Sequence, residues 1–282
     1  MNSYIISTWL VLLATTACLQ NVNCENLTPL ISAVMDNDVN LVKRLLANGA
    51  DTKATYGYKG YTALMIAAEH ANNKMAEILL SKSDAKAAST YGYTALMLAT
   101  ENGNDKLVEI LLPKSDVKAA TTSGNTALMN AARYGTAQMV ELLLPKSDVK
   151  ATNSYEETAL MIAAGFGTAK MVQILLPKSD AKAVNTNEET ALIYATRNGN
   201  DKMVEILLPK SDAKAANTYG FTALMYAAVF GYDKIVEILL PKSDAKAANE
   251  YGYTALMLAS KYGNARTVEL LLPKSDANVS NQ

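Results

Sequence analysis

The chain has 282 residues, and its 26 basic and 27 acidic side chains give a formal net charge of −1. Because these charges balance, no strong field favours a nucleic acid or an anionic membrane as its partner. Cys18 and Cys24 are the only cysteines, so the chain beyond residue 24 cannot form an internal disulfide.

The N-terminal segment has the composition of a targeting sequence. Residues 1–24 contain no charged side chain, and residues 4–17 are mostly apolar. This run is short for a membrane span, which needs about 20 residues, but it suits the core of a secretory signal peptide. We expect a cleaved signal peptide over residues 1–24, and hence a protein that is secreted or held in the endomembrane lumen. An uncleaved N-terminal anchor and a lipid-modified Cys18 are the alternatives.

From residue 28 onward the sequence repeats itself. Thr-Ala-Leu followed by Met or Ile occurs seven times at an interval of 32 residues, and Thr-Pro-Leu-Ile at Thr28 is a more divergent eighth copy. Self-similarity at such a period predicts a solenoid. Because repeats fill residues 28–282, no independent catalytic domain has room. The seven threonines are Thr62, Thr94, Thr126, Thr158, Thr190, Thr222 and Thr254.

The repeat that begins at Thr94 shows the expected unit. Thr94 stands at a helix N-cap, and residues 96–100 place apolar side chains on one face of a short helix. Gly103 ends this helix, because glycine accepts the positive φ common at that position. Residues 107–112 form a second helix, which Pro113 cannot continue. The predicted unit is helix, turn, helix and an extended loop or hairpin.

These residues resemble the ankyrin repeat. The resemblance rests on Thr-Pro-Leu-x-x-Ala at Thr28, on a recurring glycine nine residues after the Thr, and on a Val-x-x-Leu-Leu second helix. It implies an all-α ankyrin-repeat solenoid of about eight helix-turn-helix repeats with short finger loops or hairpins. Residues 25–61 would form the N-terminal capping repeat, residues 62–253 six internal repeats, and residues 254–282 the C-terminal capping repeat and tail. The glycines are Gly103, Gly135, Gly167, Gly199, Gly231 and Gly263, and positive φ is expected at each.

The repeats depart from the family pattern in their turns and caps. Pro-Lys-Ser-Asp replaces the Gly-Ala-Asp turn, and Met or Ile, as at Met97, replaces the family's His. Losing that His removes a polar tie, so we expect the ankyrin fold with an altered turn. Arg44 and Thr267 put polar side chains where other repeats are apolar, as the outer faces of a stacked array require.

The residue inventory argues against an enzyme. His70 is the only histidine, so neither a zinc site nor a Ser–His or Cys–His nucleophile can be assembled. The recurring Lys-Ser-Asp could be imagined as a ladder of Ca²⁺ or acid–base sites, but Ser and Asp have an ordinary hydrogen-bonding role in turns. We expect no catalytic residue, cofactor or metal.

The resemblance implies a partner-binding surface. In ankyrin proteins a partner docks on the concave side, at the finger tips and the exposed end of each first helix. In this sequence those positions lie three and one residues before each Thr, and seven and eight after it, and they vary between repeats while the core barely changes. The candidate binding residues are Tyr91, Tyr93, Arg133, Tyr134, Tyr155, Glu157, Phe166, Glu189, Arg197, Tyr219, Phe221, Phe230, Tyr251, Tyr253 and Tyr262.

Aromatic side chains concentrate toward the C-terminal repeats, where Tyr219, Phe221, Tyr251 and Tyr253 are expected to be solvent-exposed interface anchors. The expected function is a non-catalytic, monomeric scaffold that binds another protein and, once the signal is removed, no membrane. Two alternatives stay open. The finger tyrosines could pack on neighbouring fingers as scaffold, and the near-identical repeats could form a structural spacer or a self-assembling or membrane-active module of a secreted, toxin-like protein.

Overall fold

A computed structural model describes residues 26–275. The expected signal peptide, with Cys18 and Cys24, lies outside the described residues. Residues 26–275 form sixteen α-helices, and none of these helices is long and apolar enough to cross a bilayer. They divide into two compact units, which meet in the sequence between Thr122 and Ser123 and are called unit 1 and unit 2.

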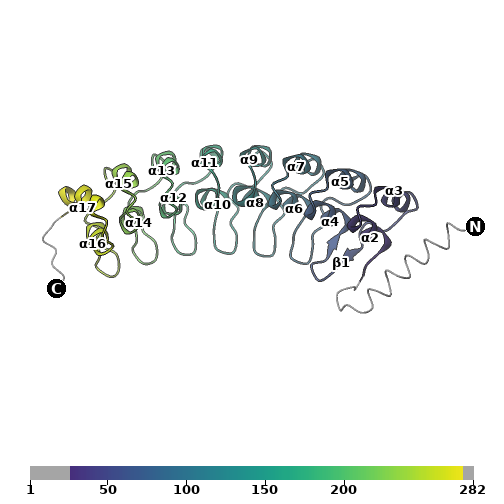
Figure 1. The fold of residues 1–282 in the computed structure, drawn as a ribbon, viewed down its shortest axis with the longest axis horizontal. Coiled ribbons are helices and arrows are strands. Elements are labelled where there is room, and N and C mark those ends of the chain that lie inside the picture. The colour runs from purple at the N-terminus through teal and green to yellow at the C-terminus, as the bar shows by residue number, and fades with distance from the viewer. Residues whose placement is uncertain (1–25, 276–282) are drawn as a thin grey trace, which may run out of the picture. The chain divides into compact units, whose positions relative to one another are not determined.

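Unit 1 contains three helix pairs and one β-hairpin (Figure 1). The hairpin joins the first two repeats, and its short strands pair antiparallel with Thr55 opposite Thr62 and Tyr56 opposite Tyr61. The helix pairs are α2 (Pro29–Met35) with α3 (Val39–Ala47), α4 (Ala63–Glu69) with α5 (Asn73–Leu80), and α6 (Ala95–Glu101) with α7 (Asp105–Leu111); the strands are β1 (Thr55–Tyr56) and β2 (Tyr61–Thr62).

Unit 2 contains five helix pairs. Its first helices pack against one another in one row and its second helices in another, with finger loops extending from the first row (Figure 1). Together with unit 1 this makes eight repeats, which confirms the predicted all-α solenoid. The pairs are α8 (Ala127–Tyr134) with α9 (Ala137–Leu143), α10 (Ala159–Phe166) with α11 (Ala169–Leu175), α12 (Ala191–Arg197) with α13 (Asp201–Leu207), α14 (Ala223–Phe230) with α15 (Asp233–Leu239), and α16 (Ala255–Lys261) with α17 (Ala265–Leu271); 3-10 turns follow at η1 (Leu176–Lys178) and η2 (Leu272–Lys274).

The repeated threonine starts every first helix. The Thr94 hydroxyl oxygen accepts from the backbone N–H of Met97 at 3.3 Å, and the threonines of the other seven repeats cap in the same way. The cap satisfies one of the free N–H groups that every helix start leaves. Leu96 and Met97 are then fully buried, so the conserved part of each repeat is a capped helix that faces the core.

The prediction of a left-handed glycine after the first helix is correct at Gly103 but wrong at Gly135 and Gly167. Gly103 has φ of 66°, whereas Gly135 and Gly167 have φ of −90° and continue into an extended threonine that caps the next helix. Glycine is required there by space instead. A Cβ on Gly167 would lie 2.8 Å from the Ala132 carbonyl oxygen, closer than packed atoms allow.

The two expected caps differ in their outcome. Arg44 is exposed, as predicted. Thr267 is fully buried, and its hydroxyl donates to Asp233 Oδ1 at 2.6 Å. The prediction that Thr267 lies on a polar outer face is therefore wrong, because its side chain turns toward the preceding repeat and ties α17 to α15.

Asparagine side chains form hydrogen bonds between repeats, which the sequence analysis did not predict. Asn102 Nδ2 donates to the carbonyl oxygens of Ala68 and Glu69 at 3.1 and 2.8 Å. Asn264 Nδ2 makes the same pair of bonds to Ala228 and Val229 at 2.7 and 3.0 Å. These bonds join the turn after one first helix to the C-terminal end of the preceding first helix.

Candidate protein-binding surface

In unit 2, a buried asparagine organises each of four finger turns. Asn217 Oδ1 accepts from the backbone N–H groups of Tyr219 and Phe221 at 3.1 and 3.0 Å. The backbone N–H of Asn217 donates to the Phe221 carbonyl at 3.0 Å. These bonds close a tight turn in which residues two apart take opposite directions. The same pattern recurs at Asn153, Asn185 and Asn249.

The residue three before each Thr, which we call the outer finger position, points into solvent. Tyr155, Tyr219 and Tyr251 in unit 2 are 66%, 55% and 64% exposed, and Tyr91 in unit 1 is 45% exposed. The backbone of Tyr155 and Tyr219 is nevertheless fixed, because the next finger donates to their carbonyls from Thr186 N at 2.9 Å and from Glu250 N at 3.2 Å. The prediction of exposed side chains is confirmed for Tyr219 and Tyr251.

The residue one before each Thr, the inner finger position, turns toward the first helix. Phe221 and Tyr253 are half-buried, so the prediction that these two side chains are exposed is wrong. The asparagine bonds rotate the inner residue inward. The Phe221 ring lies 5.4 Å from the ring of Tyr226, and the Lys261 ammonium lies 4.7 Å from the centre of the Tyr253 ring.

Glu157 at an inner position is tied into a network between two repeats. Its Oε1 accepts from the Tyr194 hydroxyl at 2.6 Å and its Oε2 accepts from Asn153 Nδ2 at 2.9 Å. Burial first, and then the bond to Glu157, raise the pKa of Tyr194 above its usual range. Tyr194 therefore stays a neutral donor, and Glu157 serves the scaffold.

Glu189, also at an inner position, is paired with Arg197. Glu189 is only 5% exposed, and Arg197 Nη1 lies 2.7 Å from its Oε1. The Arg197 guanidinium also lies 5.0 Å from the Tyr194 ring centre. Arg197 thus balances the negative charge of the buried Glu189 carboxylate. The acidic groups that the middle fingers expose are Glu156 and Glu188.

The last turns of the first helices form a second exposed set. Arg133 lies over the Phe166 ring at 3.9 Å and over the Tyr134 ring at 5.6 Å. Cations placed over aromatic faces are attracted by the ring quadrupole, so Arg133 orders both rings while leaving them accessible. The exposed aromatic residues of this set are Tyr134, Phe166, Phe230 and Tyr262.

In unit 1, Tyr93 is at the inner position of its finger and is half-buried. Burial raises the pKa of the neighbouring Glu101 carboxyl, and a hydrogen bond with Tyr93 opposes that rise. Tyr93 therefore belongs with the inward-facing residues of unit 2, and Tyr91 remains the exposed residue of this finger.

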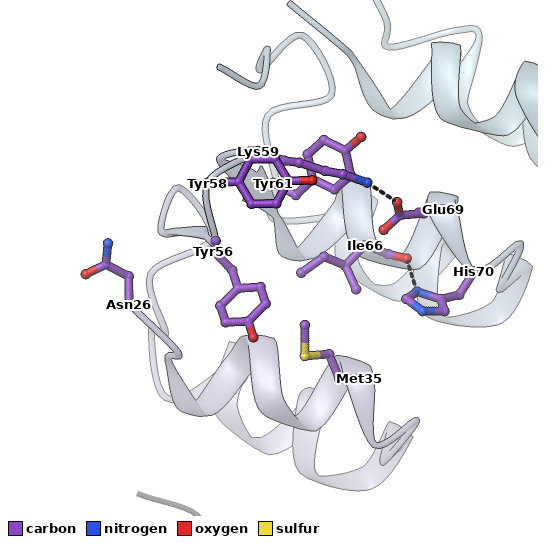
Figure 2. Close-up of a pocket in the computed structure, with 10 residues that line it drawn as sticks. Asn26, Met35, Tyr56, Tyr58, Lys59, Tyr61, Ile66, Glu69 and His70 are labelled. Atoms are coloured by element: carbon purple, nitrogen blue, oxygen red, sulfur yellow. Dashed lines mark hydrogen bonds and ion pairs between the residues drawn. The ribbon is translucent and has the colours of Figure 1, made fainter. Parts of the chain in front are cut away.

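Unit 1 also holds a pocket of about 430 Å³ that the sequence reading missed. Figure 2 shows the Lys59 side chain reaching to Glu69, with Met35 and Tyr56 across the pocket from this pair. Lys59 Nζ lies 3.1 Å from Glu69 Oε1 and 5.1 Å from the Tyr61 ring centre, and the bond to Glu69 raises the pKa of Lys59. The sequence indicates that this finger differs from the others, because the chain is one residue longer between Asp51 and Thr62 than between Asp84 and Thr94. The other lining residues are Asn26, Gly57, Tyr58, Ile66 and His70.

The recurrent Lys-Ser-Asp has the turn role expected of it. Asp116 Oδ1 accepts from Lys118 N at 3.0 Å, and Ser115 Oγ donates to the Leu111 carbonyl at 2.9 Å. Among residues 26–275 there is no group of three His, Cys, Asp or Glu side chains placed to hold a metal ion.

Comparison with known proteins agrees with this geometry. A family model described as ankyrin repeats in three copies matches overlapping segments that run from residue 7 to residue 282. No curated protein sequence matches the chain. The matched segments are residues 7–90, 30–122, 82–153, 128–217, 160–249 and 210–282.

Proposed function

Because the chain belongs to the ankyrin-repeat family, whose members generally act as protein–protein interaction modules, we propose that it is a non-catalytic scaffold. It binds another protein through its finger tips and first-helix ends, and it does so as a monomer. The outer finger tyrosines and the exposed helix-end aromatics are its anchors.

One observation carries this proposal. In unit 2 the outer tyrosines Tyr155, Tyr219 and Tyr251 are more than half exposed, although each sits on a turn closed by asparagine bonds. Side chains presented on a fixed backbone lose little freedom on binding. Large aromatic side chains with few rotors are the residues that most often dominate interfaces.

The inner finger residues have a supporting role in this proposal. Glu157 and Glu189 are occupied by Tyr194 and Arg197, so their charges are satisfied within the fold. We therefore assign partner contacts to the outer positions, and stability of the finger row to the inner ones.

The test compares three forms of the full chain as baits for proteins of the compartment into which it is delivered. One is unchanged, one carries Tyr155, Tyr219 and Tyr251→Ala, and a control carries Glu141, Glu205 and Glu237→Ala on the exposed side of the second helices. We expect a partner that the unchanged and control forms retain and the tyrosine variant loses. Equal retention by all three would place the interface elsewhere, and concentration-dependent self-association would favour an assembling module.

We also propose that the protein is secreted or lumenal. The support is the uncharged, apolar N-terminal segment, which is too short to hold a protein in a bilayer. Mass spectrometry of the mature protein should find an N-terminus between Cys18 and Glu25. Because Trp9 is the only tryptophan, the mature protein should lack tryptophan fluorescence, and recovery of a peptide containing Trp9 would contradict the proposal.

A further inference from the structure

A row of lysines follows the turns that leave the second helices. The first four of these turns in unit 2 read Pro-Lys-Ser-Asp, then Ala or Val, then Lys, and both lysines of each of the four are exposed. We call this set the lysine edge; in unit 2 it consists of Lys146, Lys150, Lys178, Lys182, Lys210, Lys214, Lys242 and Lys246.

The turn fixes the backbone of these lysines and directs their side chains outward. Asp180 Oδ1 accepts from Lys182 N at 2.9 Å, and Ser179 Oγ donates to the Leu175 carbonyl at 2.9 Å. Ala181, between Asp180 and Lys182, is buried. The turn is thus anchored by its small apolar residue, while the flanking lysines on either side reach solvent.

Successive turns of unit 2 lie side by side. The helices they leave pack in sequence, α9 on α11, α11 on α13 and α13 on α15, and Ser243 Oγ reaches the Ala213 carbonyl of the preceding turn at 3.5 Å. Packed helices are spaced by about 10 Å. The lysine edge therefore repeats its charges at about that interval within unit 2.

The edge is positive although the whole chain is nearly neutral. Each turn carries two lysines and one aspartate. Among the described residues, Lys150, Lys182 and Lys214 form no ion pair, whereas Lys170 pairs with Glu141 and Lys234 pairs with Asp201. Because the screening length, about 8 Å at physiological salt, is shorter than the interval between turns, only a ligand that runs along the edge interacts with several turns at once.

We infer that the lysine edge binds a linear sulfated polysaccharide. Lysine ammonium groups are mobile point charges suited to sulfate groups whose spacing is irregular. The aspartate uses Oδ1 within the turn, so Oδ2 can accept from sugar hydroxyls. The edge carries no aromatic or arginine side chain, whereas single-stranded nucleic-acid sites rely on aromatic stacking. This surface is distinct from the finger residues, so its test does not depend on the proposed protein partner.

Heparin binding by the full chain tests the inference. Lys150, Lys182 and Lys214→Gln removes three edge charges and leaves intact the backbone N–H groups that the turns use. The matched control, Lys74, Lys106 and Lys202→Gln, makes the same charge change at exposed positions of second helices. At about 0.15 M salt we expect the edge variant to bind heparin about tenfold or more weakly. The slope of log Kd against log salt should fall by about two.

The control variant should bind heparin nearly as the unchanged protein does, and desulfated heparin should not bind. Equal weakening in the edge and control variants would overturn the inference, since it would reflect net charge alone. Binding of desulfated heparin at unchanged affinity would also overturn it. A single-stranded DNA of similar length that binds as tightly would replace the polysaccharide by a nucleic acid as the ligand of this edge.

Discussion

The hydroxyl of Tyr194 donates to Glu157 across 37 positions of sequence, at 2.6 Å. This bond joins a first helix to the finger of the preceding repeat, and Asn185 Nδ2 donates in turn to the Tyr194 hydroxyl at 3.0 Å. Glu157, which the sequence predicts to contact a partner, therefore links two neighbouring repeats within the fold.

Replacing Tyr194 by Phe should destabilise unit 2. The change leaves a half-buried carboxylate without its tyrosine donor, and hydrogen bonds to charged groups contribute about 1.5–3 kcal/mol. Urea unfolding of the variant should show a loss in that range. Tyr226→Phe is the control, because its hydroxyl is bonded by Asn217 at 3.0 Å and donates to no carboxylate in the hydrogen bonds described for unit 2. It should cost less, and a larger cost than that of Tyr194→Phe would contradict the ranking.

Alkaline pH should destabilise the protein through its buried tyrosines. Burial raises the pKa of Tyr61, Tyr194 and Tyr226 in the folded chain. In the unfolded chain, tyrosine has a pKa of about 10. Above that pH the unfolded chain has released protons that the folded chain keeps, so the free energy of unfolding falls as pH rises. Their contribution is complete below about pH 10. The slope of stability against alkaline pH should be shallower in Tyr194→Phe, and an unchanged slope would contradict the assignment.

Gly167→Ala should be costly although Gly167 has a negative φ. The added Cβ would lie 2.8 Å from the Ala132 carbonyl oxygen and 3.0 Å from that of Ala163, so backbone must move, at a cost on the order of 1–3 kcal/mol. Because each repeat contacts only its neighbours, the loss should broaden the unfolding transition. Gly263→Ala is the comparison, since it has φ of 76° and open space around it and should cost about 1 kcal/mol from backbone strain alone. Equal, small losses of stability at both positions would contradict this ranking, because they would show that the Ala132 backbone moves at little cost.

Two finger glutamates hold strained backbone that glycine should relieve. Glu156 and Glu188 both have φ of 59°, at the position where Gly220 has φ of 74°. A left-handed residue other than glycine costs about 1–2 kcal/mol, partly offset by the greater freedom of glycine in the unfolded chain. Glu156→Gly and Glu188→Gly should each raise stability by about 0.5–1 kcal/mol, measured by urea unfolding. Gly220→Ala should do the reverse, because its Cβ would also lie 2.9 Å from Asn249 Cα.

The repeat pattern was sufficient to predict the helices, the threonine N-caps of the first helices and the number of repeats, because those depend on local signals such as Thr94 and Pro113. The site was predicted less well. Tyr219 and Phe221 are only two residues apart and equally aromatic, yet one is exposed and the other half-buried. The difference arises from the bonds of Asn217, a side chain whose role is visible only when the turn is closed. Likewise, the glycine at Gly167 was recognised, but its reason lies in the Ala132 carbonyl of another repeat.

The alternation between outer and inner finger positions separates binding from stability. Tyr155, Tyr219 and Tyr251→Ala removes exposed side chains, so its melting temperature should change little. Its partner affinity should fall by several kcal/mol, at about 2 kcal/mol or more for each true anchor. Phe221 and Tyr253→Ala should act oppositely, because these rings pack against Tyr226 and Lys261. That pair should lower the free energy of unfolding by about 1–3 kcal/mol while weakening binding less. Both variants are measured for melting temperature and for affinity to one partner. A loss of stability in the outer variant would show that its three tyrosines stabilise the fold. Full retention of affinity in that variant would show that the partner binds away from the fingers.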